Sequence, residues 1–434
     1  MGSKALTKVQ SVALMAIVVV ATAGGGAAYL LWSASQLPPE DIRIGVCGDL
    51  DQPGGKNILQ AVILAAEQVN AEGGILGRNF TIVVEDDDST SGDLAVSNNA
   101  FTKLITIDNA EYVIDSGTGT FIPHIDIGAE HHKIMFATSN ALDDLAQMVL
   151  DDYNRYKYFF RVRPNATSGA GAMFNSILTL ENYTDFDKVA ILAQDNSAYN
   201  AIALELSSSL PRNGFDIVYN SKVATTVTDF ASYFAAVEAS GAQMLIPMIS
   251  GQAAISFAKE YTSRQSPLVV WGSMAAATSN TFWSLTEGKC EYVSSLGQPI
   301  SSGYPLTNKT VQTREAYIQR WGVIPEAYAA YGYDLVRFIL PDAIKRAGTT
   351  ETEAVIKALE TTDVETSLAR HFVFTSSHDV MVGAASSNGP AGDYMLFCEF
   401  QWQNGTQVPV YPKETMQEAG ATYKYPPWQG PWSE

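Results

Sequence analysis

The amino-acid sequence predicts an α/β protein with two lobes, each built on a parallel sheet. Short apolar runs alternate with amphipathic segments of helical spacing between residues 41 and 137, and the same rhythm restarts after Pro164. Such a βαβ series is typical of parallel sheets with helices on both faces. Hydrophobic residues make up 46% of the 434 residues and charged residues 17%. The chain is therefore able to bury the cores of two or three domains.

In the first series, each short apolar run predicts a buried strand. These strands are expected at residues 42–47, 80–85, 112–115 and 133–137. Apolar residues at helical spacing from Ile58 to Val69 predict the first helix, and Gly73 and Gly74 supply its stop. Residues 94–107 predict the second helix.

The second series repeats this pattern and predicts another lobe over residues 164–294. Its strands are expected at residues 189–193, 217–219, 244–248 and 268–271. The clearest helices are expected at 201–210 and 230–239. Two lobes of similar size suggest a cleft between them, which is a usual place for a small ligand.

The N-terminal segment predicts a membrane anchor. Residues 11–32 carry no charge and follow Lys4 and Lys8. Their helical length of about 33 Å is enough to cross a hydrocarbon core of about 30 Å. The basic residues place residues 1–10 in the cytoplasm as a short tail and the rest of the chain outside, after a linker at 33–40. A cleaved signal segment is the alternative.

A polar, proline-bearing linker at 33–40 and a set of sequence triplets agree with an extracellular or periplasmic location at the cell membrane. Asn-x-Ser/Thr triplets, each a weak signal alone, mark candidate glycosylation sites. They begin at Asn79, Asn165, Asn182, Asn308 and Asn404. The net charge of -19 and pI of about 4.6 repel phosphate backbones, so no nucleic-acid partner is expected.

The cysteines predict neither a disulfide scaffold nor a zinc site. Cys47, Cys290 and Cys398 are few, lie far apart and lack metal-ligand spacing. Cys47 is expected to be a buried apolar thiol, whereas a bridge between Cys290 and Cys398 stays open.

Other candidate sites are weaker still. The acidic run at 85–88 lacks the spacing of a calcium loop, and the adjacent His131 and His132 point in different directions. No nucleophile elbow, phosphate-binding lysine loop or catalytic Cys/His pair is present. We therefore expect no cofactor, no metal and no enzymatic activity.

Several segments, in order along the chain, resemble one family. A helix ends in Asn70, followed by the sequence GGILGR at residues 73–78 and a strand ending in EDD. Further matches are VIDSGTGT at 113–120, ILAQDNSAY at 191–199, AAYGYDLV at 329–336 and CEFQWQNGTQVPVYP at 398–412. The chain thus resembles type 1 periplasmic binding proteins of the leucine/isoleucine/valine-binding kind, the substrate-binding proteins of branched-chain amino acid ABC transporters.

The resemblance implies two Rossmann-like lobes joined by a three-segment hinge. The first lobe would comprise 41–162 and 296–390, and the second 164–294 and 392–412. The tail at 413–434 lies beyond the resemblance. Family members close on a ligand between the lobes and usually deliver it to the permease of an ABC transporter.

The resemblance also implies which side chains contact the ligand. One wall would offer hydroxyl and amide donors and the other an aromatic and a thioether. The first wall would hold Thr118, Thr120, Ser139 and Asn140, and the second Tyr199, Ser250 and Met274.

One departure from the family affects the ligand class. Amino-acid binders place an acid after the Trp-Gly end of a strand to hold the ammonium group, and this chain has Met274 there. A buried ammonium without a counter-charge is costly. Either Asp49 or Asp195 replaces the acid, or the ligand lacks an ammonium. Asp195 is also expected to cap the helix before Tyr199.

The sequence thus predicts a solute-binding protein that captures an amino acid, organic acid or amide for an ABC importer. A ligand-sensing ectodomain is the first alternative, although a ten-residue tail carries no output domain. A surface-structural glycoprotein is the second, and side chains filling the cleft would favour it.

Overall fold

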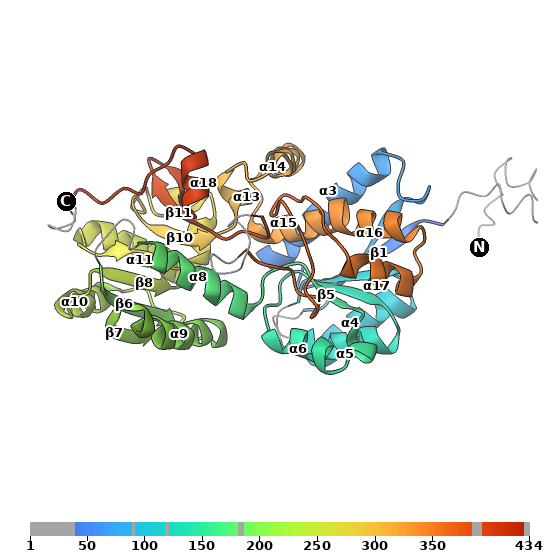
Figure 1. Cartoon of the computed structure of the whole chain (residues 1–434), viewed down its shortest axis with the longest axis horizontal. Coiled ribbons are helices and arrows are strands. Elements are labelled where there is room, and N and C mark those ends of the chain that lie inside the picture. Colours follow the sequence, from blue (N-terminus) through green and yellow to red (C-terminus); the bar gives the residue numbers. More distant parts are fainter. Residues whose placement is uncertain (1–39, 89–91, 118–120, 181–185, 384–392, 429–434) are drawn as a thin grey trace, which may run out of the picture.

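The computed structural model describes residues 40–88, 92–117, 121–180, 186–383 and 393–428. These residues form an elongated molecule with two lobes side by side (Figure 1). Strands and helices near the N-terminus build one end, and the C-terminus lies at the other.

Within the described residues, the first lobe contains a five-stranded parallel sheet in the order β2-β1-β3-β4-β5. Its strands are β1 (Ile42–Gly48), β2 (Phe80–Asp86), β3 (Tyr112–Asp115), β4 (Ile134–Ala137) and β5 (Phe159–Arg161). The four strands expected in this series agree to within one residue at each end. Their apolar runs are buried on both faces, as the sequence pattern indicates.

Helices cover both faces of this sheet. One face is covered by α3 (Pro53–Ala71), α15 (Ala327–Asp334), the π-helical turn η3 (Leu335–Ile339), α16 (Leu340–Ala347) and α17 (Thr352–Glu360). The other face is covered by α4 (Leu94–Thr106), α5 (Phe121–Glu130) and α6 (Asp143–Asp151), with the short α7 (Tyr153–Tyr156) next along the chain.

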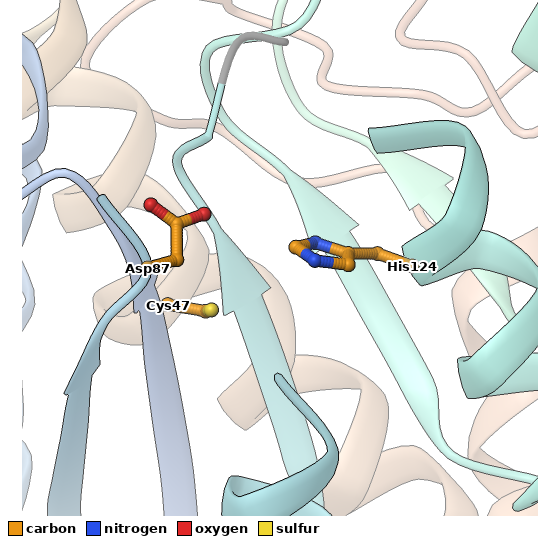
Figure 2. Close-up of side chains that lie close together, drawn as sticks. All are labelled: Cys47, Asp87 and His124. Carbon is orange, nitrogen blue, oxygen red and sulfur yellow. The ribbon is translucent and has the colours of Figure 1, made fainter. Parts of the chain in front are cut away.

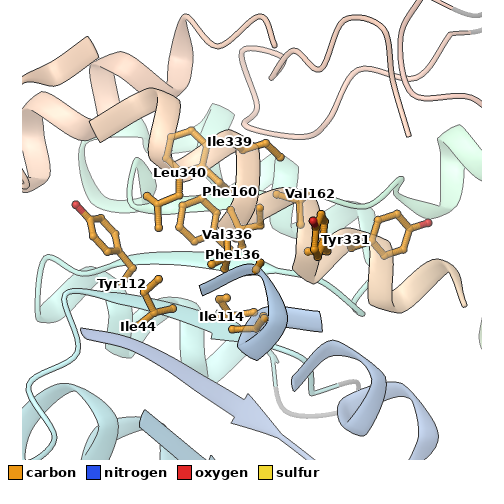
Figure 3. Packing of buried hydrophobic residues seen from close by; sticks show 14 of the residues in the cluster. Ile44, Tyr112, Ile114, Phe136, Phe160, Val162, Tyr331, Val336, Ile339 and Leu340 are labelled. Atoms are coloured by element: carbon orange, nitrogen blue, oxygen red, sulfur yellow. The ribbon is translucent and has the colours of Figure 1, made fainter. Parts of the chain in front are cut away.

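Alternation along the strands separates the two cores. Ile44, Ile114 and Phe160 point toward Val336 and Leu340 of the C-terminal helices (Figure 3). Their strand neighbours point to the opposite core. A segment near residue 340 thus completes the core of the N-terminal lobe.

The second lobe repeats this architecture. Its described residues form a four-stranded parallel sheet in the order β7-β6-β8-β9. The strands are β6 (Lys188–Gln194), β7 (Asp216–Val223), β8 (Met244–Met248) and β9 (Val269–Val270). One face packs against α8 (Ala166–Leu180) and α9 (Ser197–Ser209), and the other against α10 (Ala231–Ala239) and α11 (Gly251–Arg264). The short α12 (Phe282–Leu285) follows.

A third sheet corrects the expectation that all sheets are parallel. In the part of the chain that the structure describes, β10 (Ser294–Gly297), β11 (Cys398–Gln403) and β12 (Thr406–Tyr411) pair antiparallel. Asn404 and Gly405, with φ of 52° and 80°, form the turn between β11 and β12. Asn-Gly favours positive φ at both positions, so a tight hairpin joins these strands.

The described chain passes between the lobes at three places. It leaves the first lobe between Arg161 and Ala166, returns between Gly297 and Ile300, and leaves again after Met395. Met395 lies in the core of the first lobe, a few residues beyond the expected boundary at 390. The short α13 (Pro299–Ser302) and the longer α14 (Asn308–Trp321) follow the second passage.

The C-terminal tail packs on the second lobe after α18 (Lys413–Glu418). Tyr423 lies 5.8 Å from Trp271, measured between ring centroids. The indole of Trp428 donates a hydrogen bond to the carbonyl of Ser266 at 3.0 Å. The tail to residue 428 is therefore an integral part of this lobe.

Candidate functional site

The loops after β3 and β4 bring two of the expected ligand residues together in the first lobe. Ser139 Oγ donates to the carbonyl oxygens of Ser116 at 2.6 Å and Gly117 at 2.9 Å. Asn140 Oδ1 accepts from the backbone N–H of Leu142 at 2.8 Å. Both side chains thus hold the loops at the carboxyl edge of the sheet, where α/β proteins commonly bind ligands.

The backbone of β1 and the side chain of Ser116 lie very close together at this edge of the sheet. A side chain on Gly48, the last residue of β1, would place its Cβ 1.8 Å from Ser116 Oγ. Ser116 Oγ in turn donates to the carbonyl of Cys47 at 3.0 Å. Thr118 and Thr120, the other two residues expected on this wall, lie outside the described residues.

Arg163 is a cation at this wall that the sequence pattern does not reveal. Its guanidinium donates to the carbonyl of Ser139. Its buried Nε has no hydrogen-bond partner among the described residues. Burial raises the pKa of the neighbouring Tyr331 to about 12, and the positive charge of Arg163 opposes that shift. A half-buried guanidinium with a free donor suits an anionic ligand group.

Tyr199 lies on the opposite wall, in the first turn of α9. Burial raises the pKa of its phenol to about 12, the phenol of Tyr328 adds to the shift, and hydrogen bonds with Ser250 and Ser273 oppose it. Tyr328 belongs to α15, which packs in the first lobe. The two phenols are therefore close enough to interact across the boundary between the lobes.

Ser250 also belongs to this wall, whereas Met274 lies deeper. The backbone N–H and the hydroxyl of Ser250 both donate to Gln194 Oε1, at 2.9 and 2.7 Å. Met274 is fully buried in the apolar core formed with α10 and α11. Its thioether therefore contributes to the core of the second lobe.

Helix α9 is capped by Asn196, one residue after Asp195, which was expected to cap it. Asn196 Oδ1 accepts from the N–H of Tyr199 at 2.9 Å, which is the capping bond expected of Asp195. Asp195 lies at the surface, 3.1 Å from Lys222 Nζ, and the hydrogen bond from Asn200, together with this ion pair, lowers its pKa. A surface position in an existing ion pair makes Asp195 a poor partner for a ligand ammonium.

A cavity also lies between the two lobes. It has a volume of about 830 Å³ and is lined by Asn57 and Gln60 of α3, Asn280 and Ser284 of the second lobe, and Glu326 before α15. Asn57 Nδ2 donates to Glu326 Oε2 at 3.3 Å. The residues that line this cavity include neither Tyr199 nor Arg163, so it is a separate part of the space between the lobes.

The cysteines are all buried and free, so Cys290 and Cys398 form no disulfide. Cys47 is not in purely apolar surroundings, since the nearby carboxylates of Asp115 and Asp87 add to the effect of burial in raising its pKa. The expectation that Cys47 is buried is confirmed, and the expectation that its surroundings are apolar is wrong.

The candidate glycosylation sites differ in accessibility. Asn79, Asn308 and Asn404 are exposed, whereas Asn165 Nδ2 donates to Asp379 Oδ2 at 2.7 Å. Asn182 lies outside the described residues, as does the expected anchor at 11–32. Among the residues that are described, no helix combines the length and apolar character needed to cross a bilayer.

Comparison with known proteins gives the family of this two-lobed α/β chain. Residues 41–386 match the family model described as periplasmic binding protein, and the chain belongs to that family. A search of curated protein sequences finds no match.

Solved structures share the fold at low sequence identity. A Silicibacter pomeroyi protein, provisionally assigned to branched-chain amino acid ABC transport, has a TM-score of 0.79 at 20% identity and covers 89% of this chain and 100% of its own. LivJ from Streptococcus pneumoniae, solved with isoleucine, has a TM-score of 0.66 at 17% identity, covering 86% and 100%. An R. palustris ABC-transporter solute-binding protein, solved with benzoate, has a TM-score of 0.65 at 15% identity, covering 85% and 95%.

Proposed function

We propose that this protein is the substrate-binding component of an ABC importer and that it captures a small carboxylate-bearing molecule between its lobes. Organic acids without an ammonium group are the favoured ligands, and amino acids and amides are the alternatives. The observation that carries the proposal is the position of Arg163 beside the Ser139 loop, with Tyr199 on the opposite lobe close enough to Tyr328 of α15 for the two phenols to interact electrostatically. Isoleucine and benzoate, found in two structures of the same fold, each carry a carboxylate and an apolar body.

The chemistry of the two walls supports this ligand class. The Arg163 guanidinium provides charge-assisted hydrogen bonds to a carboxylate. The aromatic ring of Tyr199 provides apolar contact area with a polar tip. No described residue supplies an acid after β9 in the position that amino-acid binders use, so we favour acids without an ammonium group. The 830 Å³ cavity between the lobes argues against a purely structural role, in which side chains would fill the cleft.

A thermal-shift screen of the full-length chain tests the ligand class. The library pairs each carboxylic acid with its own amide, and includes branched-chain amino acids and benzoate. A ligand at 100 times its Kd stabilises the protein by about 2.7 kcal/mol, which raises the melting temperature measurably. We expect acids to give larger shifts than their amides.

Two variants separate the roles of the walls. Arg163→Gln should reduce the shift given by acids to that given by the matching amides. Tyr199→Ala should remove most of the shift for both, while the unliganded melting temperature changes little because Tyr199 is only half-buried. The exposed Arg155→Gln serves as the control and should retain the wild-type shift. Ligands whose shifts survive both cleft variants would show that this cleft is not the binding site.

We also propose that residues 11–32 anchor the protein in the cell membrane, with the lobes on the extracytoplasmic side. The length and lack of charge of this segment support the anchor. The full-length chain should remain with membranes after a high-salt wash, and deletion of residues 1–36 should release it. A mature N-terminus near Gln36 would instead establish a cleaved signal segment.

A further inference from the structure

Three potential metal ligands converge at the carboxyl edge of the first sheet. Cys47 lies near the end of β1, Asp87 directly follows β2, and His124 belongs to α5. Their donor atoms all lie within 4.8 Å of one another, and each side chain is fully buried. Figure 2 shows the sulfur, the carboxylate and the imidazole facing a common space.

The imidazole of His124 is held in a fixed orientation. Its Nδ1 lies 2.6 Å from Asp115 Oδ2, and its ring stacks on Phe101 at 4.4 Å between centroids. A proton on Nδ1, donated to Asp115, leaves the lone pair of Nε2 directed into the cluster. Histidines that ligate metals are oriented by a carboxylate in this way.

Ser97 occupies the space between two of these groups. Its Oγ lies 2.9 Å from His124 Nε2 and 3.3 Å from Asp87 Oδ2. The hydroxyl donates to Asp87 and lies beside the imidazole nitrogen, so its oxygen is placed to act as a further ligand of a cation held by these two groups.

We propose that Cys47 Sγ, an Asp87 carboxylate oxygen and His124 Nε2 bind a divalent metal ion of the zinc type, with Ser97 Oγ or a water as the fourth ligand. Thiolate, imidazole and carboxylate are ligands that Zn²⁺ and Co²⁺ accept, whereas Ca²⁺ and Mg²⁺ prefer oxygen alone. Thiolate and carboxylate together balance the two positive charges.

The required rearrangement is small. Ligand atoms at about 2.0–2.3 Å from a tetrahedral zinc lie about 3.3–3.8 Å apart. The present limit of 4.8 Å means that the distances between the donor atoms need to shorten by no more than about 1.5 Å. A metal here would tie the ends of β1 and β2 to α5. This proposal does not depend on the identity of the cleft ligand.

Metal binding is measured first on the full-length wild-type chain. After incubation with Zn²⁺ and gel filtration, we expect one zinc per chain by elemental analysis. After loading with Co²⁺ instead, we expect a thiolate-to-cobalt charge-transfer band in the near ultraviolet. Wild-type protein without stoichiometric zinc, or with cobalt but without the thiolate band, would overturn the proposal.

Variants then locate the site. Cys47→Ser should abolish the cobalt band, and Asp87→Asn and His124→Gln should each abolish stoichiometric binding. Asp115→Asn, which touches the ligand His124 and not the metal, should weaken binding about 10–100-fold. Cys290→Ser removes another buried thiol and should bind as wild type does. A band that persists in Cys47→Ser, or disappears in Cys290→Ser, would place the metal elsewhere and refute the assignment. A variant that loses its native circular dichroism is unfolded and is set aside, and the zinc and cobalt measurements on the wild-type chain then decide the proposal.

Discussion

Removal of Asp379 should destabilise the protein by about 3–5 kcal/mol, because its carboxylate neutralises a buried cation next to the first passage between the lobes. Arg161 is completely buried, and its Nε and Nη2 donate to Asp379 Oδ1 and Oδ2 at 2.6 and 2.7 Å. Its Nη1 donates to the carbonyl of Leu142 at 2.6 Å. In Asp379→Ala the guanidinium keeps one neutral partner and loses its counter-charge, while remaining out of water.

A matched pair elsewhere in the chain provides the control. Arg320 also makes two hydrogen bonds to one carboxylate, that of Glu67, both at 3.1 Å. These side chains are 43% and 49% exposed, so Glu67→Ala should cost less than about 1 kcal/mol. The two variants therefore compare similar bidentate ion pairs that differ chiefly in burial.

Urea unfolding followed by circular dichroism measures both effects. Replacing both members of the buried pair, as Arg161→Met with Asp379→Leu, should recover most of the lost stability because no charge is left in the core. If Asp379→Ala costs no more than Glu67→Ala, burial does not determine the contribution of the Arg161 pair, and this reasoning is wrong.

Three further predictions follow from other buried or bonded groups. Burial raises the pKa of Asp334 from 3.8 to about 6, so the folded state holds its proton more tightly than the unfolded state, and stability from this group falls as pH rises from about 4 to about 6. The advantage of wild type over Asp334→Asn in urea unfolding should shrink by about 2 kcal/mol over that range, and a constant difference would contradict the shift. Alkylation of denatured, unreduced protein should label all three cysteines, and any unlabelled cysteine would reveal a bridge. If the native host glycosylates the chain, glycopeptide analysis should find Asn79 modified and Asn165 unmodified, because a glycan on Asn165 Nδ2 would break its bond to Asp379; a modified Asn165 in folded protein would contradict this.

Local pattern predicted eight of the nine described strands of the two parallel sheets and missed β5 (Phe159–Arg161). The strands Tyr112–Asp115 and Met244–Met248 agree with their predicted bounds. A short apolar run between turn signals predicts a buried strand from residues that are close together in the chain. The same local reading missed the hairpin of β11 and β12, although Asn404 and Gly405 carry a strong turn signal. Residues 398–412 carry both a family motif and this turn signal. A turn signal applied there would have predicted two antiparallel strands.

The sequence by itself determined the α/β class, the two lobes and the family, because periodicity and ordered motifs depend on residues close together in the chain. Only the tertiary structure placed Arg163 beside the Ser139 loop, set Met274 in the core, and brought Cys47 and His124 to one point. These arrangements depend on which strand ends become neighbours in a sheet whose spatial order differs from its chain order. Side chains far apart in sequence meet only when that order is known, so spacing along the chain could not reveal them.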